Sequence, residues 1–210
     1  MVYSAANEQR FEFKVTDKYG EVLDLDGLEF LFHPNNPSVS NKIQQCYVIV
    51  DVETTGLDPE KSQITEIGAL KIAAGNPAET FQHYLKISGS VPQKIVKLTG
   101  ITDDILNQKG EDKQHVLSEF KKFTANSTII CHNAKFDLEF LKQAYEQQGM
   151  EWKYDSVIDT LQLARKKDPN LKSYRLKYLL KHYNLSEEQS HEALNDCYDT
   201  WRLFDKLNKI

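Results

Sequence analysis

Residues 47–67 read YVIVDVETTGLDPEKSQITEI, a stretch that opens as an apolar β-strand and closes as another. Asp51 and Glu53 interrupt the first strand two residues apart. Side chains on a strand alternate between its two faces, so both acids share one face and the valines take the other. Like charges at this spacing repel and raise each other's pKa in a low dielectric. Two interpretations stay open: a positive group lies between the acids, or the strand end emerges into water.

A third acid lies on the buried side of a predicted helix in IICHNAKFDLEFLKQAYEQQG, residues 129–149. Counting back three and four residues from Phe140, Leu141 and Ala144 leads to Asp137. A carboxylate buried alone costs several kcal/mol unless it is paired or bound to metal. The helix dipole favours an Asp in a first turn, but it does not explain why this side chain points inward.

A fourth acid follows in SHEALNDCYDTWRLFDKL, residues 190–207. Helical spacing puts Asp196 on the apolar stripe with Leu203 and puts Asp199 on the polar side. His191 precedes Asp196 by five residues and would not share its face, so we expect it in the turn before the helix. A lone His in such a place is ordinarily structural or exposed.

Four acids thus point toward one interior: Asp51, Glu53, Asp137 and Asp196. Two divalent cations would supply four positive charges and prefer oxygen ligands. Two such ions about 4 Å apart are the usual arrangement for phosphoryl transfer. His191 has a suitable ordinary pKa to take a proton from water there.

The composition is that of an ordinary globular chain. The 210 residues suffice for one sizeable domain with a small appendage. No signal peptide or membrane span is visible, and three widely spaced cysteines argue against disulfides, so we expect a cytoplasmic protein. The net charge of −5 does not predict a general electrostatic affinity for nucleic acid. Contact with nucleic acid would need a local patch or bound metal.

The pattern of elements predicts an α/β protein. Residues 1–45 read as a β appendage, with a hairpin from 11–16 and 21–25 and a further strand at 27–32. Beyond them, strands are expected at 47–53, 65–72, 81–87, 127–132 and 157–158. Helices are expected at 92–98, 113–123, 135–148, 160–166, 174–183 and 192–207, with Asp159 and Ser173 as caps. A meander followed by alternating helices and strands implies a mixed sheet covered by helices.

Three motifs in this order, DVETTGL, HNAKFD and HEALND, resemble those of the DEDDh (DnaQ-like) 3′–5′ exonucleases. The resemblance runs from about Tyr47 to Leu207, includes LTGIT (98–102) and IDTLQLAR (158–165), and does not cover residues 1–45. It implies an RNase H-like fold in which a mixed five-stranded sheet is flanked by helices. The expected domains are therefore 1–45, a β appendage of unknown role, and 46–210, the exonuclease domain.

The resemblance also implies roles for individual residues. Asp51, Glu53, Asp137 and Asp196 would ligate two Mg²⁺ or Mn²⁺ ions, and His191 would be the general base. The residues implied to hold the terminal nucleotide are Thr54, Thr55, Gly56, Leu57, His132, Asn133 and Phe136, with Leu57 packed on the base. Packing and turn formation remain the alternative for this second set; Asn133, for instance, is also suited to cap a helix. Glu66 is interpreted as structural.

The resemblance implies that the chain is a 3′–5′ exonuclease that releases nucleoside 5′-monophosphates by two-metal hydrolysis. Its expected substrate is the 3′ end of single-stranded DNA. A proofreading subunit bound to a DNA polymerase and an exoribonuclease are the alternatives. LTGIT resembles exonuclease domains of bacterial replicative polymerases, but the tail by which the epsilon subunit of DNA polymerase III grips its polymerase is not seen. The complete set of five catalytic residues disfavours a non-catalytic binding module. No membrane partner is expected, and a homodimer stays open.

The segment ARKKDPNLKSYRLKYLLKHY, residues 164–183, has seven Lys or Arg and one acid. It would suit a single strand through phosphate contacts and stacking on Tyr174 or Tyr178. Its leucines also form an ordinary core stripe, which would leave the lysines as a solvated face. The sequence does not decide between these two interpretations.

Overall fold

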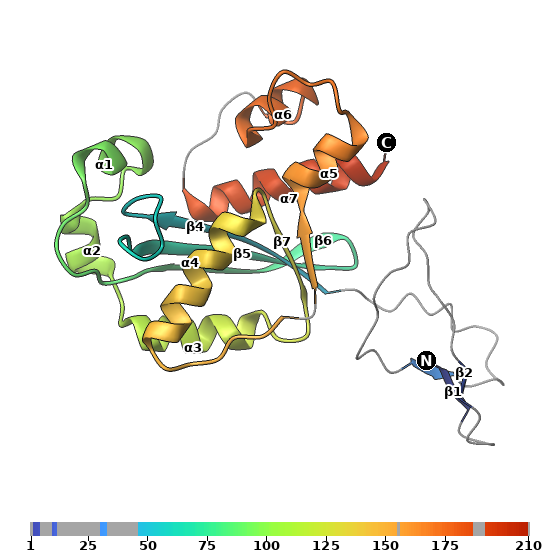
Figure 1. Cartoon of the computed structure of the whole chain (residues 1–210), viewed down its shortest axis with the longest axis horizontal. Coiled ribbons are helices and arrows are strands. Elements are labelled where there is room, and N and C mark those ends of the chain that lie inside the picture. Colours follow the sequence, from blue (N-terminus) through green and yellow to red (C-terminus); the bar gives the residue numbers. More distant parts are fainter. Residues whose placement is uncertain are drawn as a thin grey trace. The chain divides into compact units, whose positions relative to one another are not determined.

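The computed structural model describes residues 46–154, 156–186 and 192–209, together with three short N-terminal strands. The chain divides into two compact units, Met1–Ile43 and Gln44–Ile210 (Figure 1). The N-terminal unit contains the strands β1 (Val2–Ser4), β2 (Arg10–Phe11) and β3 (Phe30–Phe32). β1 lies between the other two, antiparallel to β2 and parallel to β3. The predicted hairpin of 11–16 and 21–25 falls almost entirely outside the described residues.

The second unit is built on one mixed sheet with the strand order β6-β5-β4-β7-β8 (Figure 1). Its strands are β4 (Tyr47–Thr54), β5 (Ile64–Ala73), β6 (Asn76–Tyr84), β7 (Thr128–Cys131) and β8 (Ser156–Asp159). The first three form an antiparallel meander, and β7 runs parallel to both β4 and β8. This confirms the predicted five-stranded mixed sheet flanked by helices.

The helices are α1 (Gln93–Thr99), α2 (Asp103–Lys109), α3 (Lys113–Phe123), α4 (Ala134–Gln147), α5 (Thr160–Lys167), α6 (Leu176–His182) and α7 (Ala193–Lys209). In the described part of the chain, no helix is both long and apolar enough to span a membrane. Asp159 caps α5 as predicted, because its carboxylate accepts the Leu161 N–H at 2.9 Å. The prediction for Ser173 is wrong: α6 starts later, after Arg175 at its N-cap.

Two further elements differ from the sequence prediction. α2 was not predicted, although its Thr102 cap accepts the Ile105 N–H. The sequence shows a capping Thr there, but the helix is too short for a clear apolar period. β6 begins and ends earlier than the expected 81–87, because its pairing with β5 stops at Tyr84 and Leu85 bridges to Glu111 instead.

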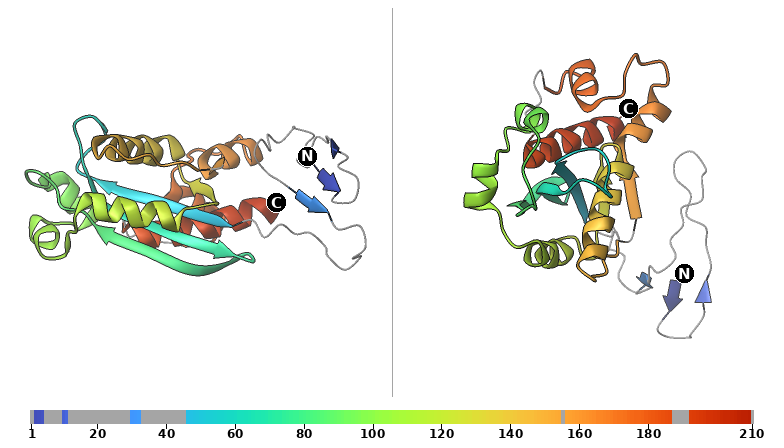
Figure 2. Two further views of the ribbon diagram at one scale, coloured as in Figure 1. Left: turned by 90° about the horizontal axis from the view of Figure 1, so that it is seen from below. Right: turned by 60° about the vertical axis from the view of Figure 1, so that its left-hand side comes forward.

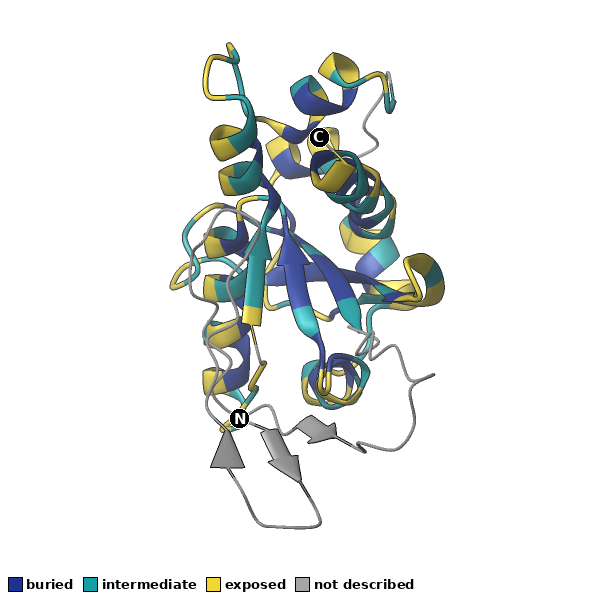
Figure 3. Cartoon of the chain, turned by 90° about the vertical axis from the view of Figure 1, so that its right-hand side faces the viewer, coloured by how far each residue is buried: buried dark blue, intermediate teal, exposed yellow. Residues whose placement is uncertain are grey.

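Helices cover both faces of the sheet (Figure 2). Val48, Val50 and Val52 pack in the cluster that contains residues of α3 and α4. Ile49 packs on the opposite face, in the cluster that contains Cys197 of α7. The strands in the middle of the sheet are consequently buried (Figure 3). The alternation along β4 therefore directs Asp51, which follows Ile49 by two residues, toward α7.

Candidate active site

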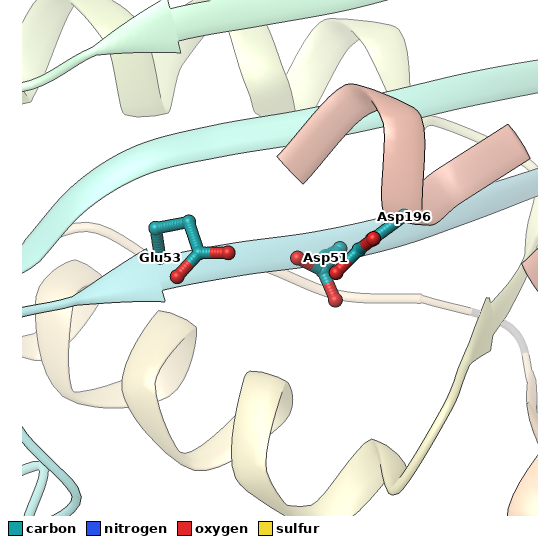
Figure 4. A group of neighbouring side chains, drawn as sticks. All are labelled: Asp51, Glu53 and Asp196. Carbon is teal, nitrogen blue, oxygen red and sulfur yellow. The ribbon is translucent and has the colours of Figure 1, made fainter. Parts of the chain in front are cut away.

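Three carboxylates from two elements meet on the α7 face of the sheet (Figure 4). Asp51 and Glu53 lie near the end of β4, and Asp196 lies in the first turn of α7. Each of the three contributes one oxygen to a group whose members lie within 4.8 Å of one another. Asp196 is only 4% exposed. The helical spacing that placed Asp196 inward is confirmed, whereas Asp199, predicted on the polar side, is also buried and pairs with Arg202.

Asp137 approaches the same strand from the other side of the sheet. β7 pairs with β4 only as far as Ile49, so beyond this residue no strand among the described residues pairs with β4 on that side. The Asp137 carboxylate takes the vacant place and accepts the Val52 N–H at 3.1 Å. Asp137 is 3% exposed, and its charge raises the pKa of Asp51. It therefore completes the edge of β4 and adds a fourth acid to the site.

Burial and mutual repulsion hold these carboxyl groups toward their neutral forms. Burial, followed by the charges of Asp137 and Asp196, raises the pKa of Asp51 well above its usual value. Burial, followed by the charges of Asp196, Glu66 and Asp137, raises the pKa of Glu53 to about 8. Burial raises the pKa of Asp137 to about 8, even though the Val52 N–H lowers it.

The chemistry of this group fits a hard divalent cation. The donors are all carboxylate oxygens, the ligands that Mg²⁺ and Mn²⁺ prefer. Within the described residues, no Lys or Arg forms an ion pair with Asp51, Glu53 or Asp137. An uncompensated group of buried acids is costly to ionise. Of the two interpretations of the Asp51–Glu53 pair, this grouping of acids favours a positive group between them over a strand end that simply emerges into water.

The start of α7 is seated on β5 next to these acids. Gly68 lies opposite Asp51 in the sheet, and a Cβ there would come within 2.4 Å of the Ala193 carbonyl carbon. Two residues earlier on the same strand face, the Glu66 carboxylate accepts the Ala193 N–H at 3.3 Å. These contacts place the first turn of α7, and with it Asp196, over β4. Gly68 was missed from the sequence; a Gly inside a strand pattern was its signal.

A second set of hydrogen bonds holds the residue just before α7. The Gln82 amide donates to Glu66 at 2.8 Å and to Glu192 at 3.0 Å. Asn195 donates to the other carboxylate oxygen of Glu192 at 2.6 Å. His191 itself lies outside the described residues, so its predicted role stays a prediction.

The turn after Glu53 presents an apolar side chain to solvent. The Thr54 hydroxyl donates to the Gly56 carbonyl at 2.6 Å. Thr55 donates its N–H to Gln63, and its hydroxyl accepts the Gln63 N–H, both at 2.9 Å. Leu57 at the tip is 84% exposed. The backbone of the turn is therefore fixed by hydrogen bonds, while the Leu57 side chain is accessible to a ligand.

His132 is engaged on both sides of its ring. Its Nδ1 lies 2.9 Å from the Thr160 hydroxyl and its Nε2 lies 2.9 Å from the Tyr174 carbonyl. A carbonyl only accepts, so Nε2 carries the proton and donates it. Burial lowers the pKa of His132, which favours the neutral ring. His132 therefore ties the end of β7 to α5 and to the segment before α6.

Asn133 and Phe136 begin the next helix. Asn133 occupies the N-cap position of α4 with a left-handed φ of 70°, but its side chain makes no capping bond. Its N–H instead donates to the Asp159 carboxylate at 3.0 Å. Phe136 is half-buried, with its ring centroid 4.9 Å from that of Phe140. Side-chain capping therefore does not explain Asn133.

A well-formed hollow among the described residues lies elsewhere. It measures about 550 Å³ and is lined by residues such as Leu138, Tyr145 and Trp152, on the outer side of α4. Asp137 points inward from the same helix. The acids and this hollow are therefore separate features, and the clustering of charge identifies the candidate site better than the size of a hollow.

Replacing Gly68 by Ala should displace the start of α7. The new methyl group meets backbone atoms, which cannot swing aside, so we expect a loss of about 1–3 kcal/mol in unfolding free energy. Binding of Mn²⁺ should weaken at the same time, because Asp196 moves. Ala69→Gly is the matched control: it destabilises β5 by about 0.5–1 kcal/mol through chain entropy without touching α7. Unchanged Mn²⁺ affinity in Gly68→Ala would refute this seating role.

Neutralising Asp51 should change how stability depends on pH in EDTA. Acids whose folded pKa is raised keep protons that the unfolded chain releases, so they reduce stability as pH rises from about 4 to about 8. Asp51→Asn removes one such acid and relieves its neighbours. The melting temperature of Asp51→Asn minus that of the wild type should therefore increase as pH rises from about 5 to about 8. The Asp58→Asn control, at an acid outside the group whose pKa is lowered by Lys61, should show no such gain. A constant difference for Asp51→Asn would contradict the repulsion.

Comparison with known proteins places these residues in one family. The family described as "RNase_T: Exonuclease" matches residues 48–204, a range that contains all four acids. The DNA polymerase III PolC-type of Listeria monocytogenes is 37% identical over 202 residues, which is 96% of this chain and 14% of that protein. The PolC-type polymerase of Oceanobacillus iheyensis is 35% identical over 82% of this chain and 12% of its own length. The chain thus spans about an eighth of these relatives.

The family match begins at residue 48, in agreement with the expectation that the exonuclease resemblance does not cover residues 1–45. The Listeria match covers 96% of the chain and therefore extends into the Met1–Ile43 unit as well.

Solved structures share the fold. E. coli Exonuclease I in complex with a dT13 oligonucleotide matches with a TM-score of 0.70 and 23% identity, over 79% of this chain and 41% of that one. Exonuclease X in complex with 5′ overhanging duplex DNA matches with a TM-score of 0.63 and 23% identity, over 78% of this chain and 91% of that one. The expected RNase H-like fold and the DnaQ-like resemblance are confirmed. On the family match over residues 48–204, this chain belongs to the RNase_T family of exonucleases.

Proposed function

We propose that this chain is a metal-dependent 3′–5′ exonuclease that hydrolyses DNA from its 3′ end and releases nucleoside 5′-monophosphates. The observation that carries the proposal is the group of Asp51, Glu53 and Asp196 oxygens within 4.8 Å, with Asp137 beside it. Bringing these acids together costs folding free energy, and the group falls within the match to the exonuclease family.

Asp51, Glu53, Asp137 and Asp196 are proposed to hold two divalent cations, Mg²⁺ or Mn²⁺. When bound, such ions lower the pKa of a water molecule and stabilise negative charge on a phosphate undergoing substitution. The chain's own part is to hold the carboxylates in place: β4 carries two of them, and the seat on β5 fixes Asp196. The hydrogen bond from Val52 orients Asp137.

His191 is proposed to take the proton from the attacking water. It stands in the third motif, five residues before Asp196, and next to Glu192, which Gln82 anchors. A neutral imidazole near pH 7 is suited to this transfer.

The terminal nucleotide is proposed to lie against the turn of Thr54, Thr55 and Gly56. Leu57 is suited to pack on the base, because its side chain is exposed at the tip of a well-held turn. Asn133 and Phe136 would line the other side. His132 would act by positioning, because both of its ring nitrogens already have protein partners.

DNA is proposed as the substrate on two grounds. The relatives are DNA polymerases, and the titles of the solved structures name a dT13 oligonucleotide and a 5′ overhanging duplex DNA. An exoribonuclease is the alternative, which a pocket that accepts the 2′-OH would favour.

A second candidate function is proofreading in association with a DNA polymerase. It is favoured by the similarity to PolC-type polymerases over nearly the whole chain, including the N-terminal unit. Affinity-tagged protein that copurifies with polymerase polypeptides would support this candidate, and recovery of the chain alone would support a free-standing enzyme. A cytoplasmic location and a homodimer stay predictions.

The direct test of the proposed activity uses 3′-labelled and 5′-labelled oligonucleotides of DNA and RNA with Mg²⁺, Mn²⁺ or EDTA. We expect mononucleotides from the 3′ label at once, a ladder from the 5′ label, and no cleavage in EDTA. Asp51→Asn and Asp196→Asn should each lower the rate by at least about 10²–10³-fold, because each removes a ligand charge. Asp205→Asn, a half-buried position on the same helix whose carboxylate pairs with Lys209, should not.

Shortened fragments from the 5′ end first, or cleavage that persists in EDTA, would contradict the proposal. His191→Ala should lower turnover far more than Mn²⁺ affinity, and ordinary turnover would remove His191 from the mechanism.

Leu57→Ser should raise KM for oligonucleotides more than it lowers kcat. The change removes an exposed apolar side chain whose full burial against a base would contribute about 1.5–3 kcal/mol, and it disturbs no core contact. Leu98→Ser, at another exposed leucine, is the control: it removes exposed apolar surface at a position outside the proposed nucleotide site, so KM should not change. An unchanged KM in Leu57→Ser would exclude Leu57 from the nucleotide site.

A further inference from the structure

The segment between the second and third motifs carries positive charge that the proposed chemistry leaves unused. Seven Lys or Arg and one acid fall within residues 164–183, in a chain whose net charge is −5. Five of these side chains are exposed and form no ion pair with a described residue. We call them the 165–181 basic surface: Arg165, Lys172, Arg175, Lys177 and Lys181.

Several lysines elsewhere in the described part of the chain are matched by acids. On α4, for example, Lys135 lies 3.7 Å from Glu139 and Lys142 lies 3.8 Å from Glu146. An ordinary solvated surface intersperses both signs in this way. A surface of one sign instead attracts a ligand of opposite charge.

The structure also separates the two sides of α6. Leu176, Leu179 and Leu180 are buried in a cluster that includes two leucines of α7. Lys177 and Lys181 are exposed and lie one helical turn apart on the outer side. The core stripe explains the leucines of this segment, but it leaves the lysines without a structural purpose.

The 165–181 basic surface adjoins the candidate site. The Tyr174 carbonyl accepts the hydrogen bond from His132, and Arg175 follows directly in the chain. The Arg165 guanidinium lies over the Tyr174 ring, 5.4 Å from its centroid. α5 and α6 group with α7, which carries Asp196, on one side of the unit (Figure 1).

Aromatic rings are interleaved with the lysines on α6. Tyr178 and His182 stack with their centroids 6.0 Å apart and their planes at 8°. Lys177 and Lys181 each precede one of these residues in the chain. Basic side chains next to aromatic faces are typical of proteins that bind single strands without reading their sequence.

We propose that the 165–181 basic surface binds the phosphate backbone of a single-stranded polynucleotide upstream of its 3′-terminal nucleotide. This inference rests on the proposed function, because that function sets the 3′ end at the acids. The surface would give the enzyme affinity for strands longer than the nucleotides in the site. Each lysine contact with a phosphate releases a counterion, so the affinity should fall with salt.

Fluorescence anisotropy in EDTA tests this binding apart from catalysis. The probe is a 5′-labelled single-stranded DNA of about 15 nucleotides. At about 0.1 M salt, Lys177→Glu/Lys181→Glu should raise the Kd about tenfold. The salt slope of log K should become shallower by about 1.4, which is the value for two lost phosphate contacts.

The matched control is Lys121→Glu/Lys142→Glu on α3 and α4, which changes the net charge by the same amount. It should raise the Kd less than about twofold. Equal weakening in both variants would overturn the proposal, because total charge would then explain the binding. A polyglutamate peptide of equal charge that competes as well as the oligonucleotide would overturn the assignment to nucleic acid.

The binding and cleavage experiments together distinguish a failure of this surface from a failure of the proposed function. Binding that depends on Lys177 and Lys181, in a protein that cleaves nothing with Mg²⁺ or Mn²⁺, would contradict the function but support the surface. Normal cleavage with binding indifferent to these lysines would contradict the surface alone. Circular dichroism of each variant checks that it folds as the wild type does.

Discussion

Repulsion among buried carboxyl groups is the constraint on which the rest of the structure depends. Asp51, Glu53, Asp137 and Asp196 are brought together in partly or wholly buried positions, and the charges of the other three raise the pKa of Asp51. Without other contacts to hold them, the four carboxyl groups would move apart because their charges repel. The fold prevents this by carrying the acids on elements whose positions are fixed by other contacts. Divalent cations fit the group because they compensate its charge with the ligands it offers.

β4 contributes both to the hydrophobic core on one face of the sheet and to the candidate site on the other face. Its valines build the core under α3 and α4, while its acids face α7. Because β7 stops early, the free edge of β4 is available to the carboxylate of Asp137. On the other side, Gly68 lets the α7 backbone approach closely enough to bring Asp196 over the strand. The same strand therefore serves stability along its first half and chemistry along its second.

Much of this arrangement could be predicted from the sequence, because periodicity reports which side of an element is buried. It assigned Asp51 and Glu53 to one face, and it turned Asp137 and Asp196 inward. It failed for Asp199, whose ion pair with Arg202 makes burial tolerable in a way that a count of apolar residues does not register. Contacts between distant segments, such as Glu66 with Ala193 or His132 with Tyr174, have no local signature and required the structure.

The measurement that bears most directly on the central claim is an anomalous-difference map from crystals soaked in MnCl₂. The account predicts two manganese peaks about 4 Å apart, at about 2.0–2.2 Å from oxygens of Asp51, Glu53 and Asp196, with Asp137 close by. Crystals of Asp51→Asn should lose at least one of the peaks. A map without manganese among these four side chains, or with the side chains turned away from one another, would contradict the account.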